Sequence, residues 1–330
     1  MQIWRRGNTP MLHPEIIGHV QVILAMCIVG SSVAVGKVVS VEVPVFLASF
    51  IRFAVALLFI VPLNRMLAGS LRLPPRKVAL LLGAQAFFGI FLFSVCLLLG
   101  LKRTAAVNAG VIFGMLPAVN ALLSVWLLHE KLNQRYAIGI GLSVLGAVLL
   151  ELRSADGGGF GVGVVGMLLI LCAVFCEAMF SVIGKLSGLS LPAVTVTCWV
   201  ILIGVALFMP GALYEAASFD FRSISPKVWW LLAYYGVVVT VIGFSLFYAG
   251  LSKISAVAAG VHMAFVPLSA MAIAVLILGE AFGLIDALSL LLVLAALFVI
   301  GLKPESPAQS LIEKPLAFLK EWQKWLNKNQ

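Results

Sequence analysis

Charge is the first thing that this sequence lacks. Only 11% of its 330 residues are Asp, Glu, Lys or Arg, whereas 62% are hydrophobic. A soluble globular domain carries roughly twice this charged share. The composition therefore excludes an ordinary soluble protein. The net charge of +9 does not indicate a nucleic-acid partner, because basic residues of a membrane protein are distributed by membrane side.

Cysteines and the short motifs of catalysis are also scarce. There is no HExxH zinc motif, and no nucleophile stands beside an obvious base, so an intramembrane enzyme has little support. No group of residues has metal-ligand spacing, and we expect neither a metal nor a cofactor. All the cysteines lie inside apolar runs, where we expect reduced, structural thiols. They are Cys27, Cys96, Cys172, Cys176 and Cys198.

What the sequence does contain is a series of apolar runs of about 18 to 25 residues, the length of a helix that crosses a bilayer. The predicted fold is an all-α polytopic membrane protein with ten transmembrane helices joined by short connections. The predicted spans are residues 16–36, 44–62, 77–100, 105–128, 134–151, 163–185, 192–209, 227–250, 255–278 and 283–301.

Two stretches of the chain repeat each other. Residues 100–130 align without a gap with residues 250–280, an offset of 150 (250 − 100). Because each half has an odd number of spans, the second copy must enter the membrane upside down. The prediction is two inverted five-helix repeats around a central cavity, an architecture seen in carriers. The recurring residues that mark the backbone are Gly100 and Gly250, Gly110 and Gly260, Pro117 and Pro267, and Glu130 and Glu280.

The repeats set the predicted domain boundaries. Gly157-Gly158-Gly159 indicate a flexible joint between the halves. Near the end of the chain, residues 315–328 place tryptophans on one helical face with lysines at its edge, which is typical of a helix on the inner leaflet; a disordered tail is the alternative. The predicted units are a first repeat at 1–152, a joint at 153–162, a second repeat at 163–302 and a cytoplasmic amphipathic tail at 303–330.

Orientation follows from the basic residues outside the spans. Most of them fall on the membrane side that holds both termini, which cytoplasmic segments favour; Lys102 and Arg103 fall on the other side. We therefore expect both termini in the cytoplasm and the protein in the cell inner (plasma) membrane. The first run has a basic flank but no convincing cleavage site, so we expect it to remain as a span.

Three further features mark the spans. Gly36-Lys37 and Gly184-Lys185 close the first and sixth spans, Pro44 and Arg52 lie in the second span, and Pro117 is followed by His129-Glu130-Lys131-Leu132 and a glycine-rich fifth span. With the two five-span repeats, these features resemble the drug/metabolite transporter superfamily, EamA family, over roughly residues 16–301. The resemblance implies a carrier of small metabolites, amino acids or drugs, with outward transport the expected direction.

Polar residues inside the spans are the candidates for a binding site. A charge at the bilayer centre costs about 2.5–3.5 kcal/mol on insertion scales and usually faces a cavity. Glu177, Ser181 and Lys185 follow at four-residue steps and share a helix face. Glu177 either holds a cationic group or a proton in the cavity, or pairs with a basic side chain to order the bundle.

Four further residues are assigned to the predicted cavity. His262 replaces Ile112 of the first half, which suggests a proton site or a hydrogen bond to substrate; a histidine bonded to a backbone carbonyl is the alternative. Asn108 is a potential donor in the fourth span. Trp199 and Tyr234 are expected to contact an apolar substrate.

Three cations and two prolines have structural or gating interpretations. Arg52 either binds a substrate carboxylate or makes a structural pair with Glu177 or a loop acid. Lys37 and Lys185 end their spans, where snorkelling to the interface explains them and a gating role stays open. Pro117 and Pro267 each remove a backbone hydrogen bond in mid-span and are candidate hinges or plain packing kinks.

Two other patterns concern contacts between helices. Gly110 and Gly114 form a GxxxG pattern, which suits close pairing of the fourth and ninth spans or a homodimer. Glu130 and Glu280 are expected to cap the helix that begins next after each of them.

A secondary transporter is the first functional interpretation, with rocking of the two halves around the cavity. Its expected partners are a small-molecule substrate and the lipid bilayer, without nucleic acid. A non-transporting receptor or scaffold is the alternative, and an intramembrane enzyme is a third.

Overall fold

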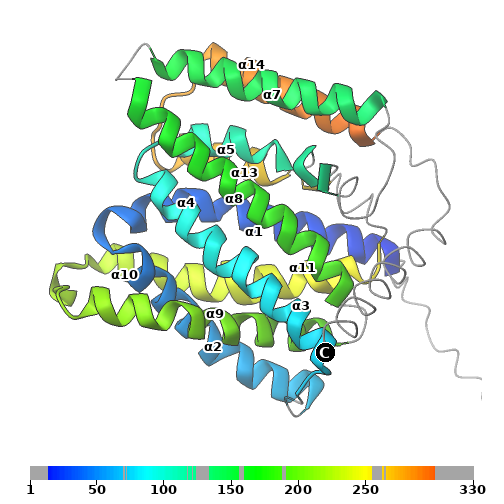
Figure 1. Cartoon of the computed structure of the whole chain (residues 1–330), viewed down its shortest axis with the longest axis vertical. Helices are drawn as coiled ribbons and strands as arrows, with labels where there is room; N and C mark the ends of the chain where they lie inside the picture. The colour runs from blue at the N-terminus through cyan, green and yellow to red at the C-terminus, as the bar shows by residue number, and fades with distance from the viewer. Residues whose placement is uncertain are drawn as a thin grey trace, which may run out of the picture.

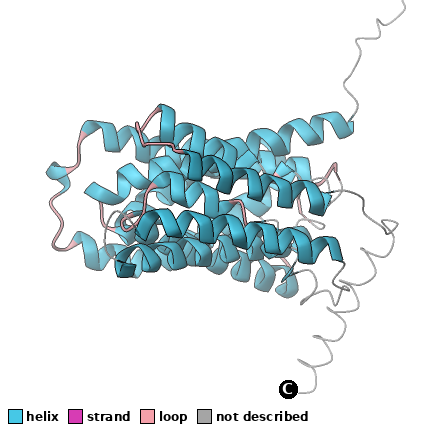
Figure 2. Ribbon diagram, turned by 90° about the horizontal axis from the view of Figure 1, so that it is seen from above, coloured by secondary structure: helices cyan, strands magenta, loops and turns pink. Residues whose placement is uncertain are grey.

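The computed structural model describes residues 14–69, 71, 73–116, 118–120, 122–123, 134–155, 160–187, 191–254, 262–263 and 265–301, and in these ranges every regular element is a helix. The predicted joint glycines, Glu130, Pro117 and the tail from residue 302 onward lie outside the described residues. The helices run along one common direction, side by side (Figure 2).

The first repeat contains α1 (Pro14–Glu42), α2 (Val45–Ala68), α3 (Arg76–Ala86), η1 (Phe87–Leu92), α4 (Phe93–Leu101), α5 (Ala106–Phe113) and α7 (Gln134–Ala155). The second contains α8 (Phe160–Ser187), α9 (Ala193–Ala216), η2 (Phe221–Ser223), α10 (Pro226–Tyr234), η3 (Tyr235–Gly243), α11 (Phe244–Leu251), α13 (Phe265–Leu276) and α14 (Leu284–Gly301).

Within the described residues, six helices are long and apolar enough to cross a membrane, and shorter apolar helices accompany them. The chain is therefore a multi-pass membrane protein. The predicted ends of three spans are too early, because α1, α2 and α9 continue to Glu42, Ala68 and Ala216. Apolar runs report the part of a helix that lies in hydrocarbon, whereas the hydrogen-bonded backbone continues past it.

The third span and its counterpart in the second half both contain a π-helical segment that hydropathy did not predict. The π-helix η1 joins α3 to α4, and η3 joins α10 to α11. With the repeat offset of 150, residues 87–92 correspond to residues 237–242, which lie inside η3. The Thr240 hydroxyl donates to the Tyr235 carbonyl five residues earlier, at 2.9 Å. This bond spans the wider π turn and stabilises it.

The fourth and ninth spans, predicted at 105–128 and 255–278 with a hinge or kink at Pro117 and Pro267, are interrupted by turns at residues 114–115 and 263. Helix α5 ends at Phe113, where Gly114 and Met115 make tighter turn-type bonds to the carbonyls of Val111 and Ile112, both at 2.9 Å. In the second half, α13 begins only at Phe265. Pro267 therefore sits in the first turn of a helix, where a missing N–H costs little.

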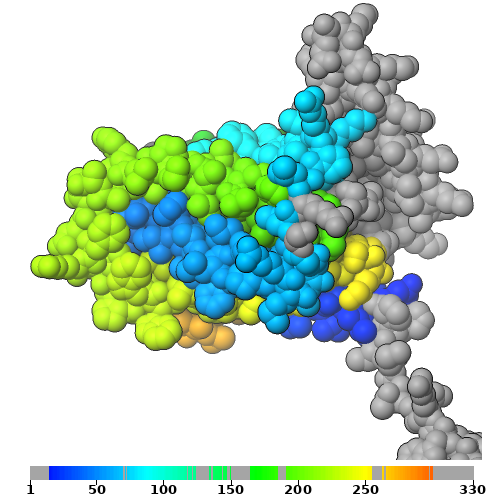
Figure 3. Space-filling model, turned by 90° about the horizontal axis from the view of Figure 1, so that it is seen from below, coloured from blue at the N-terminus to red at the C-terminus, as the bar shows by residue number. Residues whose placement is uncertain are grey.

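The two halves interlock through equivalent contacts (Figure 1). Helix α1 packs against α11 and α13 of the second half, whereas α8 packs against α4 and α5 of the first. Three elements pair with their own counterparts: α2 with α9, α5 with α13, and α7 with α14. Figure 3 shows α2, in blue, exposed on one face beside green segments of the second half.

Matched glycines make these crossings possible. A Cβ on Gly100 would lie 2.6 Å from Ile170 and 3.1 Å from the carbonyl oxygen of Gly166. The equivalent Gly250 has the same relation to Val22, at 2.6 Å, and to Gly18, at 2.9 Å. Both partners are offset by 148 (170 − 22 and 166 − 18). These two contacts of one half are therefore repeated at the equivalent residues of the other.

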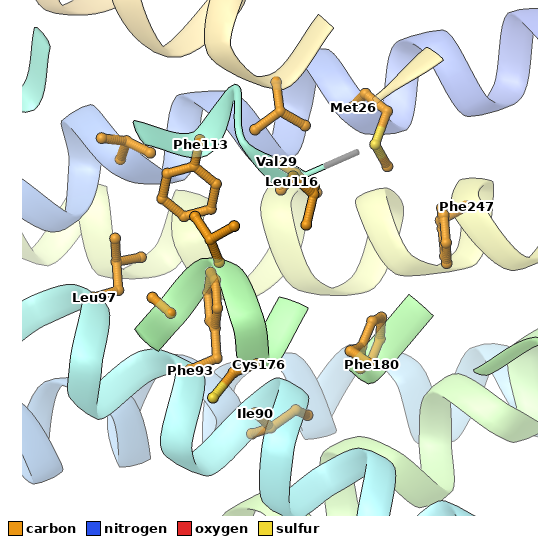
Figure 4. Close-up of a cluster of buried hydrophobic side chains, with 14 of the residues drawn as sticks. Met26, Val29, Ile90, Phe93, Leu97, Phe113, Leu116, Cys176, Phe180 and Phe247 are labelled. Atoms are coloured by element: carbon orange, nitrogen blue, oxygen red, sulfur yellow. The ribbon is translucent and has the colours of Figure 1, made fainter. Parts of the chain in front are cut away.

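The GxxxG pattern is divided between two neighbours. A Cβ on Gly110 would lie 3.3 Å from Ala270 of α13, and one on Gly114 would lie 2.0 Å from Val293 of α14. Close packing of the fourth and ninth spans thus uses Gly110. Figure 4 shows the apolar core nearby, where side chains of α1, α4, α5, α8 and α11 gather.

Candidate functional site

Arg52 is a buried cation with incomplete hydrogen bonding. It lies on α2 with 3% of its surface exposed. Its guanidinium carbon is 4.2 Å from the ring centroid of Phe53 and 3.9 Å from that of Tyr235, so the cation stacks on two aromatic faces. Its Nε and Nη1 atoms have no hydrogen-bond partner among the described residues. The two aromatic rings contact the guanidinium through its faces, while its Nε and Nη1 atoms make no hydrogen bond to the described residues.

Glu177 of α8 is an acid that interacts electrostatically with this cation. Its charge interacts with that of Arg52, although the two residues form no direct ion pair. Glu177 also interacts electrostatically with Tyr248 of α11, and it is half-buried. An acid of the second repeat and a base of the first thus share one electrostatic environment. Ser181 follows on the same face of α8, also half-buried; the side chain of Lys185 lies outside the described residues.

A buried polar contact that sequence reasoning missed joins α3 to α8 and α11. Gln85 is fully buried and donates from Nε2 to the Phe180 carbonyl, at 3.2 Å, and to the Tyr248 hydroxyl, at 2.5 Å. A Cβ on Gly184 would meet Gln85 at 2.4 Å. A polar residue inside an apolar run was the signal that could have revealed it.

The corresponding position in the other half also carries a polar side chain. Residue 85 corresponds to Tyr235 with the offset of 150, and a Cβ on Gly36 would lie 3.6 Å from the Tyr235 hydroxyl. Gly184 therefore makes room for the Gln85 side chain of the other repeat, whereas a Cβ on Gly36 would lie closest to Leu101 and Leu98 of its own half, at 3.0 and 3.2 Å. Gln85 and Tyr235 thus occupy equivalent positions in the two halves, and Arg52 stacks on the Tyr235 ring.

Trp199 and Tyr234 do not take part in the contacts of Arg52. The antiparallel register of α2 and α9 is fixed by the Phe53–Phe208 stack, with centroids 5.9 Å apart, and by the Thr195 hydroxyl donating to Asn64 at 2.8 Å. This register places Trp199 about 13 Å along the helix from Arg52. The Trp199 indole nitrogen is buried without a partner among the described residues. Tyr234 instead shares a hydrogen bond of 2.9 Å with Ser31 of α1.

His262 forms a pair with a residue that the sequence did not single out. Its Nε2 lies 2.7 Å from Nδ1 of His19 on α1, and the rings meet edge to face. Both residues are half-buried. Ser31 lies twelve residues (31 − 19) further along α1, about 18 Å away. Asn108 bonds to Thr104 in the first turn of α5, at 3.4 Å. The predicted cavity residues therefore occupy several levels of the bundle.

Lys37 holds together the connection between the third and fourth spans. Its Nζ donates to the carbonyls of Leu101 and Thr104, at 2.6 and 2.7 Å. Glu280, whose charge interacts with Lys37, accepts hydrogen bonds from the backbone N–H groups of Ala106 and Val107, at 3.0 and 2.7 Å. One cation and one acid, from different repeats, thus fix the start of α5.

Glu280 was expected to cap the helix that follows it, and this prediction is wrong. Glu280 instead caps α5 of the first repeat, because the interlocked halves bring the N-terminus of α5 closer. Helix α14 is capped by its own residue Asp286, which accepts a hydrogen bond from the Gly283 N–H at 2.7 Å.

A pocket of about 310 Å³ opens between α2, α9, η3 and α11. Its lining is apolar, with Leu63, Leu67, Val194 and Leu246 prominent, and it includes none of the predicted cavity residues. All five cysteines are free thiols, as predicted.

Comparison with known proteins identifies the relatives of this chain. The model of the EamA-like transporter family matches residues 16–152 and again residues 164–302. The chain is 34% identical over 304 residues to the uncharacterized transporter YetK of Bacillus subtilis (strain 168), which covers 92% of each protein. It is 28% identical over 215 residues to the uncharacterized transporter YdfC of the same organism, covering 64% of this chain and 67% of YdfC.

A solved crystal structure shares the fold. It matches with a TM-score of 0.62 and 20% identity, over 87% of this chain and 95% of that chain. Proteins of the matched family are transporters and not enzymes. With the family match across both repeats, the multi-pass helical fold and the relatives named as transporters, the chain belongs to the EamA-like transporter family.

Proposed function

We propose that this chain is a secondary transporter that exports small metabolites, such as amino acids, or drugs. It works by alternating access of two inverted five-span repeats around a central cavity, with ten spans in all. The observation that carries the mechanism is the equivalent interlocking of the halves, in which Gly100 and Gly250 make corresponding contacts with α8 and α1. Such symmetry gives the molecule two related arrangements, each open to one side.

Interrupted helices supply the proposed hinges. The π-helices η1 and η3 occupy corresponding positions in the two halves. The breaks near Gly114 and Met263 do so as well, and each precedes a proline, Pro117 or Pro267. A helix with an irregular turn bends there at lower cost than a regular helix does. Rocking of one half against the other concentrates its backbone changes at these places.

The Lys37–Glu280 network is the proposed gate on one side. It joins α1, the connection after α4, and the start of α5 through four hydrogen bonds of 2.6–3.0 Å. Opening that side breaks these bonds. Lys185 has the corresponding role on the other side in this proposal, because Gly184-Lys185 repeats Gly36-Lys37.

Glu177 is the proposed centre of the substrate or proton site, with Ser181 beside it. Its half-buried carboxylate and its electrostatic interaction with Arg52 support this assignment. His262, Asn108, Trp199 and Tyr234 belong to the same transport pathway at other levels. A homodimer is compatible with this arrangement.

The proposed location is the cell inner (plasma) membrane, with both termini in the cytoplasm. The distribution of Lys and Arg between the connections supports this orientation. Under it, Lys37 and Glu280 lie toward the outside, and the His19–His262 pair lies toward the cytoplasm.

Flux into or out of proteoliposomes tests the proposal. The purified full chain is reconstituted, and exchange of radiolabelled amino acids and of cationic dyes is followed. We expect saturable flux of at least one compound, reduced at least tenfold by Glu177→Gln and unchanged by Glu15→Gln, an exposed residue of α1. If neither class of compound crosses faster than in protein-free liposomes, the proposed transport of these substrates is wrong.

A further inference from the structure

The unsatisfied edge of Arg52 is the starting point of a further assignment. The two ring faces of Phe53 and Tyr235 attract the cation, but they accept no conventional hydrogen bond along the guanidinium edge. Each guanidinium nitrogen of arginine can donate an N–H hydrogen bond to an anion with oxygen acceptors. Buried polar groups in proteins are normally hydrogen-bonded. The free Nε and Nη1 atoms therefore indicate a missing acceptor.

Two neighbouring hydroxyl groups have the same property. The Tyr235 and Ser49 hydroxyls are buried; Tyr235 lies beside Arg52, and neither hydroxyl makes a hydrogen bond of good geometry among the described residues. Ser49 stands three residues before Arg52 on α2, a spacing that puts both side chains on one face of the helix. A hydroxyl can donate to an anion. The cluster thus gathers donors from α2 and η3.

The charge of Glu177 influences which ligand fits beside Arg52. Glu177 interacts electrostatically with Arg52 but does not pair with it. An anion beside Arg52 is also repelled by negative charge on Glu177, and a doubly charged anion is repelled more strongly than a singly charged one.

We propose that Arg52, Ser49 and Tyr235 form a binding site for a small monovalent anion. The ligand is either a free inorganic anion such as chloride or the carboxylate group of an organic molecule. The guanidinium supplies charge-assisted hydrogen bonds, the two hydroxyls complete the donor set, and the Phe53 and Tyr235 rings keep the guanidinium in place.

Thermal unfolding of the purified full chain in detergent tests this site without requiring transport. Sodium acetate or sodium chloride is titrated while sodium sulfate keeps the ionic strength constant. We expect a saturable rise in Tm with at least one of the two monovalent anions, because a ligand that binds only the folded form stabilises it. A failure of transport in proteoliposomes would leave this binding result unaffected.

Four variants show whether the rise comes from this site. Tyr235→Phe keeps the ring and removes one donor, and Ser49→Ala removes the other; each should weaken the apparent Kd about tenfold. Arg52→Gln should abolish the saturable rise. Arg65→Gln, an exposed position on the same helix, should leave it unchanged. General salt effects act equally on all variants, so differences between their curves report the site.

The outcomes separate the possibilities. Saturation by acetate supports a carboxylate-binding site, and saturation by chloride alone supports an inorganic anion site. The proposal is overturned if wild type gives no saturable rise with either anion, or if Tyr235→Phe and Ser49→Ala respond as wild type does. If Arg52→Gln does not fold, those two variants decide the result.

Discussion

At the scale of single residues, the structure explains why particular side chains stand where they do. Gly184 is small because the Gln85 side chain of the other repeat approaches it, and Gly36 is small because Leu101 and Leu98 pack against it. Lys37 is accommodated at the end of a span because its ammonium group donates to two backbone carbonyls. Snorkelling to the interface, the simpler interpretation of Lys37, does not describe these bonds.

Glu280→Gln should destabilise the protein by about 1 kcal/mol. The amide keeps the shape of the acid, but it accepts only through one oxygen and loses the charge that strengthens bonds to the Ala106 and Val107 N–H groups. The measurement is the denaturation midpoint in detergent, with Glu15→Gln as the control. An unchanged midpoint for Glu280→Gln would contradict the capping role.

Crowded and open glycines should respond differently to alanine. Gly184→Ala brings a Cβ within 2.4 Å of Gln85 and should cost about 1–3 kcal/mol, because the core must shift. Gly83→Ala has nothing within 4 Å, so its better helix propensity should leave stability equal or slightly higher. Thermal unfolding of both variants checks this, and equal losses would show that the Gly184 contact is unimportant.

The sequence revealed some of these residues and concealed others. Glu177 and Arg52 could be singled out because a charge in an apolar run is costly. His19 could not, since it lies near the start of an apolar run and its partner is 243 positions away. The stacking of Tyr235 on Arg52 depends equally on packing between distant helices, which periodicity does not report.

At the scale of elements, the irregular helices are the main addition to what the sequence predicted. Hydropathy located the helical segments because lipid requires long apolar runs. It did not predict η1 and η3, because a π turn and an α turn bury similar side chains. Nor did it predict the breaks at Gly114 and Met263, since the residues around them are as apolar as the rest of the span.

Thr240→Val should loosen the π-helical segment η3. The change removes the hydroxyl that bonds to the Tyr235 carbonyl at 2.9 Å and keeps the side-chain shape. We expect amides of residues 235–243 to exchange hydrogen at least threefold faster, which corresponds to the loss of roughly one weak hydrogen bond.

Thr197→Val is the matched control for that experiment. Its hydroxyl bonds to the Ala193 carbonyl at 3.0 Å in the regular turn of α9, where such a bond adds little stability. Equal acceleration in the two segments would mean that the Thr240 bond does not maintain the π turn.

At the scale of the whole molecule, two copies of one helical unit are interlocked so that each completes the other. The sequence predicted the duplication from a few matched glycines, prolines and acids. It did not predict which helices of one copy contact which helices of the other, because that depends on how the copies interlock. Glu280 is an example of such a contact, since it belongs to the second repeat but caps α5 of the first.

Interlocking of this kind predicts equal consequences at equivalent sites. Gly100→Val and Gly250→Val should destabilise the protein to a similar extent, about 2–4 kcal/mol, because each places a branched side chain against α8 or α1. Chemical denaturation of the two variants compares them directly. A large loss in one and none in the other would mean that the two crossings are not energetically equivalent.

The most direct test of the inverted architecture is the membrane side of two equivalent positions. Lys102 and Ser252 are exposed and correspond through the offset of 150 (252 − 102). Each is changed to cysteine after the five native cysteines are replaced, and intact cells are treated with a membrane-impermeant thiol reagent. The account predicts that Lys102→Cys is labelled in intact cells, whereas Ser252→Cys is labelled only after permeabilisation. Labelling of both positions from the same side would contradict the inverted repeats.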